Sequence, residues 1–443
     1  TEDGTYTSVG SGKVPTSSTA TTAVLKNGLL VPVSTKYYYK LTITLNNLDI
    51  NQSSDINANM HSKFNLQAGK QSGADKIMSL VAGEPSNTTD VITKTAPQGA
   101  TCTNTLAYDG TNDNNLRYVG ANPCNYVTFN GEAPTTGTKW VDTEKSSGSE
   151  YDVFDTKQEC EDFLEQNSYT ESDECKQKNV TTGGWRIIGV MNNVDDGTGN
   201  TETRIKLIRN DSLGDYSWDT SDSSVNNGYG VNDWSQADLM QELNGDYLNT
   251  NLSANTMWYN GQNNQKTGEY DYTKGLKASA QNLIGNTKWY LGGQEYSVYN
   301  AEGEGTAAKF YGYERGAQVW GSASNQTCND GACPRSISWI GKVALAYPSD
   351  YGYAVGEDVR STCLRKKLAD YENDNCHTSQ WLSYGKLLSP YSGNSDFVFF
   401  ATYGGLGYNG ASNSYSAVPA VYLKSDASIS EGNGTESEPF VIS

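Results

Sequence analysis

Eight cysteines place the strongest constraint on this chain, because they fall into four pairs of near neighbours. The pairs are Cys102 with Cys124, Cys160 with Cys175, Cys328 with Cys333, and Cys363 with Cys376. An even number of cysteines in Asn- and Gly-rich sequence is typical of disulfides formed in an oxidising compartment. Zinc is the alternative, but the spacing in CNDGAC does not match a zinc knuckle and no CxxC motif accompanies it. We therefore predict four local disulfides in an extracellular protein, either secreted or attached to a cell surface.

Charge and hydropathy restrict the possible partners. The net charge is −19, so nucleic acid and anionic membranes would be repelled. The chain has no apolar run near the roughly 20 residues that a membrane-spanning helix needs. Its 30 tyrosines argue against disorder. We expect a folded chain that neither binds nucleic acid nor inserts into a membrane.

Residues 1–97 predict an incomplete β-sandwich or jelly roll with an extended N-terminal arm. Two segments alternate apolar and polar residues, the pattern of strands with one buried face. Their apolar positions, which we assign to a sheet edge used in assembly, are Tyr39, Leu41, Ile43, Leu45, Phe64 and Leu66. The segment contains at most four strands, whereas a sandwich needs about seven. The polar run GEPSNTTDVITKTAP, residues 83–97, is interpreted as a linker.

Residues 98–443 predict one large α+β domain. Helical spacing occurs in WSQADLMQELNGDYLN (234–249) and TKGLKASAQNLIG (273–285). Short strands are predicted around them, for example at TKWYLGG (287–293) and SWIGKVALAYPSDYGYA (338–354). The fold class expected for the whole chain is β-rich α+β.

An acidic stretch, residues 133–183, interrupts this domain. The flanking segments CNYVTFNGE (124–132) and GGWRIIGV (183–190) read as a hairpin once the stretch is removed. The stretch has its own cysteine pair and one helical segment within KQECEDFLEQNSYTESDEC (157–175). We predict a self-contained insertion.

Several separated motifs resemble known families. The series WRIIGV, DDGTGN, RIKLIRN, WYLGG, GKVALAYPSDYGYA and PAVYLKSD resembles a widespread domain of unknown function in surface proteins of Gram-positive gut bacteria, over roughly residues 106–443. Its pattern is similar to C-type-lectin-like folds, including the formylglycine-generating type. Residues 1–97 resemble the closing strands of camelysin-like and biofilm-fibre proteins, in which the sandwich begins upstream. The resemblance implies a lectin-like domain displayed by a surface protein.

Catalytic residues are not evident in the sequence. His61 and His377 are the only histidines, and neither lies near a recognisable nucleophile motif. A formylglycine-generating activity would need reactive paired thiols, but Cys363 and Cys376 are better explained as a disulfide. We predict that the protein is not an enzyme.

Calcium is a candidate ligand of one Gly-rich loop. In VDDGTGNTE, the side chains of Asp195, Asp196 and Asn200 offer the oxygen ligands that calcium prefers. The loop lacks the EF-hand spacing and its terminal glutamate, so we favour a plain turn and predict no required cofactor.

Carbohydrate is the better small-ligand hypothesis, because aromatic rings stack on sugar faces. The candidates are the loop aromatics Tyr229, Trp234, Tyr259 and Tyr408. Tryptophans inside apolar motifs, such as Trp185 and Trp289, are expected in the core instead. A glycan or host-surface ligand is therefore a possible partner.

An unfinished sheet needs a strand from elsewhere, since unpaired strand edges attract other chains. A strand donated by a neighbouring copy would build a head-to-tail homopolymer. We therefore predict a subunit of a bacterial surface filament or pilus-like fibre, involved in adhesion or biofilm and displaying the lectin-like domain. The alternative is a monomeric surface adhesin or carbohydrate-binding module.

The donor segment should be residues 1–25, whose Gly, Ser and Thr content leaves it free before docking. Deleting it should abolish polymers in negative-stain electron microscopy of the purified protein. Fibres that persist in the shortened protein would rule out this donor.

Overall fold

The computed structural model describes residues 71–146, 150–219, 230–249, 257–260, 265–269, 275–294, 303–316, 327–328, 331–332, 336–371, 376–377, 381–382, 385–391, 395–402 and 405–443. The chain divides into two parts between Gln71 and Ser72. The predicted sandwich edge, formed by Tyr39, Leu41, Ile43, Leu45, Phe64 and Leu66, lies outside the described residues. The incomplete sandwich therefore stays a prediction.

The second part of the chain begins before the boundary that we predicted at residue 97. Helix α1 (Gly73–Leu80) buries Ile77 completely. Strand β1 (Ile92–Lys94) pairs with β2 (Asn104–Tyr108), and Ile92 lies opposite Leu106. Part of the predicted linker, residues 83–97, is therefore a paired strand, and the linker interpretation is wrong there. Ile92 is the one buried residue of this strand, which otherwise lies in a polar run.

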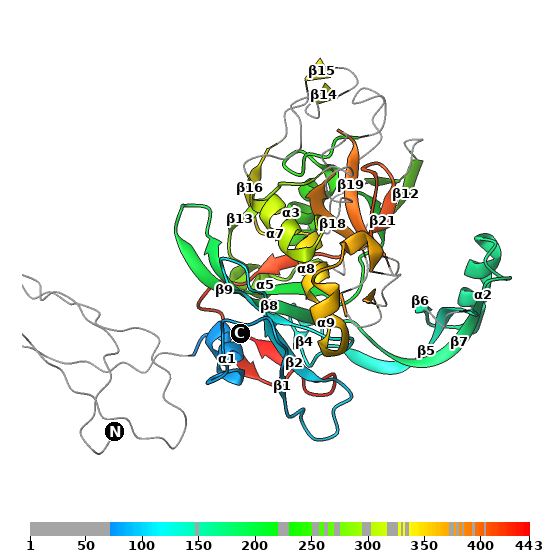
Figure 1. Ribbon diagram of the computed structural model, residues 1–443. Coiled ribbons are helices and arrows are strands. Elements are labelled where there is room, and N and C mark those ends of the chain that lie inside the picture. The colour runs from blue at the N-terminus through cyan, green and yellow to red at the C-terminus, as the bar shows by residue number, and fades with distance from the viewer. Residues whose placement is uncertain are drawn as a thin grey trace, which may run out of the picture. The chain divides into compact units, whose positions relative to one another are not determined.

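Within the described residues, ten strands form the central sheet, whose arrangement can be followed in Figure 1. Seven follow in the order β1-β2-β3-β8-β4-β24-β23, and β9, β22 and β17 continue outward from β8. All neighbours are antiparallel except β4 and β24, which run parallel. The remaining bounds are β3 (Leu116–Tyr118), β4 (Tyr126–Thr128), β8 (Trp185–Asp195), β9 (Thr201–Arg209), β17 (Val343–Ala344), β22 (Ala420–Tyr422), β23 (Ile429–Glu431) and β24 (Phe440–Ile442).

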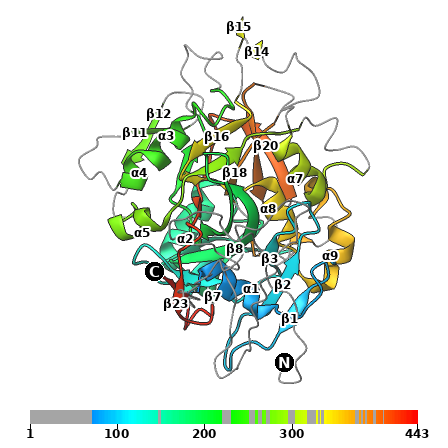
Figure 2. The same cartoon turned by 90° about the vertical axis from the view of Figure 1, so that its left-hand side faces the viewer.

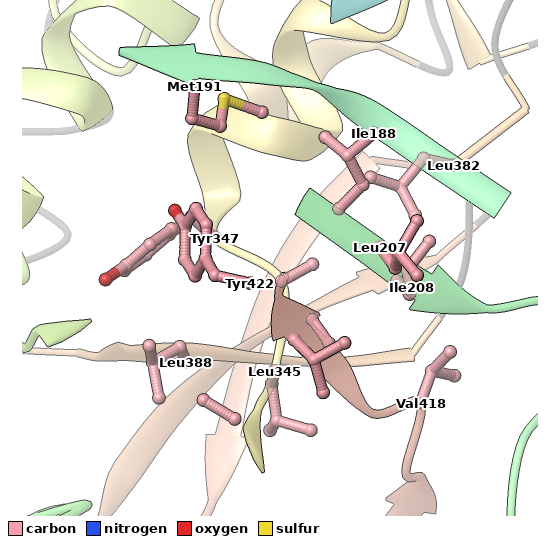
Figure 3. Packing of buried hydrophobic residues seen from close by; sticks show 14 of the residues in the cluster. Ile188, Met191, Leu207, Ile208, Leu345, Tyr347, Leu382, Leu388, Val418 and Tyr422 are labelled. Carbon is pink, nitrogen blue, oxygen red and sulfur yellow. The ribbon is translucent and has the colours of Figure 1, made fainter. Parts of the chain in front are cut away.

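Strand β8 lies at the centre of the core. Its residues from Trp185 to Met191 are all buried, as in a strand that is covered on both faces. Figure 3 shows side chains from β8, β9 and later segments of the chain gathered in one cluster, among them Ile188, Leu207, Leu345 and Val418. A Cβ atom at Gly189 would lie only 2.3 Å from the carbonyl oxygen of Leu116. Glycine therefore allows β3 to pair closely with β8.

Apart from α1 and the helix of the insertion, the described helices lie in two groups, α3 to α5 and α7 to α9, which Figure 2 shows on the left and right. The helices predicted at 234–249 and 273–285 correspond to α3 (Asp238–Asn244), α4 (Asp246–Asn249) and α5 (Ala278–Leu283). The others are α7 (Ala307–Arg315), α8 (Pro348–Tyr353), α9 (Glu357–Cys363) and the 3₁₀ turn η5 (Leu368–Asp370). The described residues are thus β-rich α+β, as predicted, while the jelly roll and the lectin-like fold stay predictions.

The strand predicted over residues 338–354 is wrong in its second half. Strands β16 (Ser338–Gly341) and β17 are followed by helix α8. Pro348 occupies the first turn of this helix, where its missing N–H costs nothing. The Asp350 carboxylate accepts a hydrogen bond from the amide of Tyr347 at 2.9 Å, which satisfies a free donor at the helix start.

Small sheets complete the described structure. They are β10 (Asp215–Ser217) with β21 (Ser414–Ser416), β11 (Met257–Asn260) with β12 (Gln265–Glu269), β13 (Thr287–Tyr290) with β16, β14 (Thr327–Cys328) with β15 (Gly331–Ala332), and the three strands β18 (Gly385–Pro390), β19 (Phe397–Thr402) and β20 (Gly405–Gly410).

Disulfides join three of the predicted cysteine pairs. They are Cys102–Cys124, Cys160–Cys175 and Cys363–Cys376. Each closes a loop of at most 22 residues in sequence separation. The fourth predicted pair, Cys328 with Cys333, stays a prediction, because Cys333 lies outside the described residues.

The acidic insertion forms its own sheet. Strands β5 (Thr135–Glu144) and β7 (Asp173–Thr182) pair along their whole length, and β6 (Glu150–Phe154) joins the far half of β5. Helix α2 (Lys157–Gln166) follows a capping box at Thr156 and is joined to β7 by Cys160–Cys175. Figure 1 shows these elements as one long ribbon. On either side of the insertion, β4 pairs with β8, as the flanking sequence predicted.

The domain should fold without this insertion. Thr135 and Thr182 are paired at its base, so replacing residues 136–181 by Asn-Gly would close a two-residue hairpin. We expect cooperative thermal unfolding by circular dichroism, with Tm within about 5 °C of the parent protein. As a control, Ile92→Asp places a charge in the core and should lower Tm further than the excision does. A shortened chain without a cooperative transition would contradict the self-contained insertion.

Candidate functional site

A pocket of about 310 Å³ opens beside the end of β8. We call it the central pocket. Polar side chains and tyrosines from distant segments line it: Asp113 and Asn115 before β3, Met191, Asn192, Asn193, Val194 and Asp195 of β8, Thr201 of β9, Thr287, Lys288 and Tyr290 of β13, and Arg315, Tyr347 and Tyr422. The fold thus brings residues separated by more than 300 positions into one site.

Arg315, at the end of α7, is the most constrained cation of the pocket. Its guanidinium carbon lies 3.4 Å from the centre of the Tyr311 ring and 5.5 Å from that of Tyr290. Its Nη1 donates to the Tyr311 carbonyl at 3.3 Å and to Glu314 Oε2 at 3.2 Å. Stacking and hydrogen bonding together fix the plane of the guanidinium.

The two carboxylates of the pocket serve mainly to hold its walls. Asp113 Oδ1 accepts from Asn193 Nδ2 at 3.0 Å, and Asp113 Oδ2 accepts from the Tyr311 hydroxyl. Asp195 Oδ1 accepts from the amide of Gly197 at 2.8 Å. The remaining oxygen, Asp195 Oδ2, lies 3.8 Å from Lys288 Nζ.

The loop proposed for calcium is a hydrogen-bonded turn between β8 and β9. Asp196 Oδ1 accepts from both the amide and the hydroxyl of Thr198 at 2.7 Å, and these bonds lower the pKa of Asp196. Asn200 Nδ2 donates to the Thr198 hydroxyl at 2.9 Å. In the part of the chain that the structure describes, no three His, Cys, Asp or Glu side chains converge as a metal site would require. One oxygen of each aspartate, Oδ1, accepts hydrogen bonds within this turn.

A buried ion cluster lies behind the pocket. Asp350 Oδ2 is 2.5 Å from Lys206 Nζ, and Asp350 Oδ1 is 2.6 Å from Arg117 Nη1. Arg117 Nε also contacts Asp109 Oδ2 at 3.0 Å, and all four side chains are buried. Burial alone would raise the pKa of Asp350, but Lys206 and Arg117 lower it to about 2. Asp350 therefore stays ionised at neutral pH.

Lys206 supports the aromatic wall of the pocket from behind. Its ammonium lies 4.3 Å from the centre of the Tyr347 ring and 5.2 Å from the rings of Tyr422 and Trp289. The Tyr347 hydroxyl accepts from the amide of Tyr290 at 2.8 Å. Tyr347 and Tyr422 thus contact Lys206 of the ion cluster, and Tyr290 is hydrogen-bonded to Tyr347.

Glu314 is a second buried acid next to the pocket. Its Oε1 accepts from the Ser349 amide at 2.9 Å, and its Oε2 accepts from the Ser349 hydroxyl at 2.6 Å. Burial raises its pKa to about 7, although Arg315 and Ser349 act in the opposite direction. At neutral pH the Glu314 carboxyl group is therefore only partly ionised, and Arg315 stabilises its ionised form.

The aromatic ligand candidates from the sequence do not form the pocket. Trp234 is buried between Trp218 and Trp339, with ring centres 5.1 and 6.3 Å away. Its assignment to a ligand-binding loop is wrong, because it packs in the core. Tyr408 stacks on Tyr391 at 4.3 Å and does not line the pocket. Tyr229 and the side chain of Tyr259 lie outside the described residues.

The alternation of side chains along a strand could have identified Tyr290, a pocket residue that was not predicted. Trp289 was expected in the core and is fully buried, so its neighbour Tyr290 must face the other side of β13. That side lines the pocket. Tyr347 and Tyr422 carry no comparable signal, because they meet only in the folded chain.

Comparison with protein-family models, curated proteins and solved structures finds no match for this chain. The described residues contain no helix that is both long and apolar enough to span a membrane.

The stability of the protein should depend on Glu314 between pH 4.5 and 7. Because burial raises its folded pKa from 4.5 to about 7, its contribution is complete below pH 4.5 and is lost as pH rises through 7. At about 1.4 kcal/mol per pKa unit, the loss is of the order of 3 kcal/mol. Glu314→Gln cannot ionise, so its unfolding free energy should fall less over this range in urea titrations.

Glu304→Gln is the matched control, because the hydrogen bonds from Lys309 and Tyr313 lower the pKa of Glu304. Its stability curve should run parallel to that of the parent above pH 5. Parallel curves for Glu314→Gln and the parent would contradict the buried-acid assignment.

Proposed function

We propose that residues 72–443 form a saccharide-binding module of an extracellular surface protein. The observation that carries this proposal is the central pocket, whose tyrosines, amides, hydroxyls and charged groups converge on about 310 Å³. This volume lies at the small end of ligand pockets and suits one sugar residue. Tyr347 and Tyr422 are buried, so the Tyr290 ring offers a face for the C–H groups of a sugar, and the polar groups offer partners for its hydroxyls.

The pocket walls are held by interactions that do not need a ligand. Asn192 donates to the carbonyls of Asp113 and Asn114 at 3.1 and 3.0 Å, and its amide donates to Asn115 Oδ1 at 2.8 Å. The Tyr290 amide bonds the Tyr347 hydroxyl. A site ordered in advance loses little entropy on binding, which favours recognition of a small ligand.

The residues that line the pocket favour binding over nucleophilic catalysis. None of the described lining residues is a cysteine, histidine or serine, so a Ser-His or Cys-His pair is absent from that set. We therefore propose a non-enzymatic module.

The disulfides support the proposed compartment. Three disulfides within the described residues fit a protein outside the cytoplasm. Attachment to the surface of a Gram-positive bacterium and display on a filament remain proposals, which rest on the sequence resemblance and on residues 1–97.

The module should bind glycans through Tyr290. On a glycan array the purified protein should select a subset of saccharides, and titration calorimetry with the best of them should give Kd for parent and variants. Tyr290→Ala removes one aromatic wall but keeps the backbone bond to Tyr347, so we expect binding at least about tenfold weaker.

Tyr169→Ala is the control, because Tyr169 is 46% exposed in the insertion and is not part of the pocket. Its affinity should equal that of the parent. A parent protein that binds no glycan, or a Tyr290→Ala variant with parental affinity, would refute the proposed site. Release of a hydrolysed product would make it an enzyme instead.

A further inference from the structure

The central pocket contains two cationic side chains whose donors are not all used within the protein. Arg315 Nη2 and Lys288 Nζ make no hydrogen bond to any residue that the structure describes. Glu314 engages Arg315 only at Nη1, at 3.2 Å. The other neighbouring carboxylate oxygens are beyond hydrogen-bond reach, since Asp113 Oδ2 is 3.7 Å from Arg315 Nε and Asp195 Oδ2 is 3.8 Å from Lys288 Nζ. Two cationic groups therefore remain available to a ligand.

The acceptors of the pocket are largely engaged. Both oxygens of Asp113 accept from protein donors, as does Asp195 Oδ1. Asn115 Oδ1 accepts from the Asn192 amide, and Asn192 Oδ1 accepts from the Thr203 hydroxyl. A ligand that is rich in acceptors thus complements this pocket better than one that is rich in donors.

The arrangement of Arg315 suits a planar anion. Its guanidinium is held flat on Tyr311, and a quarter of its side chain remains exposed. A carboxylate is planar and can take two parallel hydrogen bonds from a guanidinium. A doubly charged phosphate ester would meet stronger repulsion from Asp113 and Asp195, so the mixed charge of the pocket favours a single negative charge.

We propose that the central pocket binds acidic saccharides of the hexuronate class, with the ligand carboxylate on Arg315 and Lys288. This inference rests on the proposed saccharide-binding function and specifies its ligand. Arg315 makes the principal ion pair, and Lys288 contributes a second, more mobile charge from the pocket rim, where its side chain is 37% exposed.

The test compares matched sugars that differ only in the carboxylate. Methyl glucuronide and methyl glucoside, and the corresponding galacturonide and galactoside, are titrated into the full chain by calorimetry at pH 7. We expect the uronides to bind at least tenfold more tightly than the neutral glycosides. Added NaCl should weaken the binding of the uronides and leave the binding of the neutral glycosides unchanged, because salt screens the ion pair.

Variants assign the effect to residues. Arg315→Gln should weaken uronide binding at least tenfold and Lys288→Gln two- to fivefold, and each should weaken uronide binding more than it weakens neutral glycoside binding. Lys309→Gln is the matched control, since Lys309 lies on the same helix but pairs with Glu304 and does not line the pocket. If Arg315→Gln does not fold, Arg315→Lys keeps the charge without the planar fork, and it should still bind uronides more weakly than the parent protein does.

Outcomes separate this inference from the function on which it rests. Equal affinity for uronide and neutral glycoside, or uronide binding that is unaffected by Arg315→Gln and Lys288→Gln, overturns the acidic specificity but leaves a saccharide site. Absence of binding to all four glycosides and to every glycan on the array overturns the saccharide function itself. Preference for the uronides with loss in Arg315→Gln supports both.

Discussion

Asp350 is the buried charge on which the rest of the site depends. It joins Arg117 of β3, Lys206 of β9 and the start of α8 in one contact set. Both cations and the carboxylate are almost completely removed from water. A buried ion cluster of this kind adds little net stability compared with apolar packing, but losing one member leaves an unpaired charge at a cost of about 3–5 kcal/mol. The cluster therefore selects one packing of α8 on the sheet and penalises the others.

The same cluster determines the shape of the pocket. Asp350 receives the amide of Tyr347, and Lys206 lies against the rings of Tyr347 and Tyr422. Helix α7 packs beside α8 through Glu314 and Ser349, and it ends at Arg315. The positions of Tyr347, Tyr422 and Arg315 at the pocket thus follow from backbone elements fixed in the core. Sites supported in this way are more exact than sites built from loops alone.

Features local in sequence could be predicted, and features that join distant segments could not. The described disulfides, the insertion and its flanking pair of strands depend on short spacings or on contiguous patterns, so the sequence was sufficient for them. Asp350 meets partners that are 144 and 233 positions away, and nothing in their neighbourhoods marks the contact. Trp234 was assigned to a ligand-binding loop, but its ring packs against Trp218, a contact that is also distant from any local pattern. Strand β1 was missed because it has only three residues, of which one is buried.

The insertion has a mechanical consequence. Its two strands lead into β4 and β8, which are inner strands of the ten-stranded sheet and pair with each other. A pulling force applied at the disulfide-closed tip would travel along ten paired positions of β5 and β7 before it reached the body. The force would then enter the sheet through β4 and β8, which have neighbours on both sides. Tension on the insertion would therefore be shared across the sheet and would not detach an edge strand.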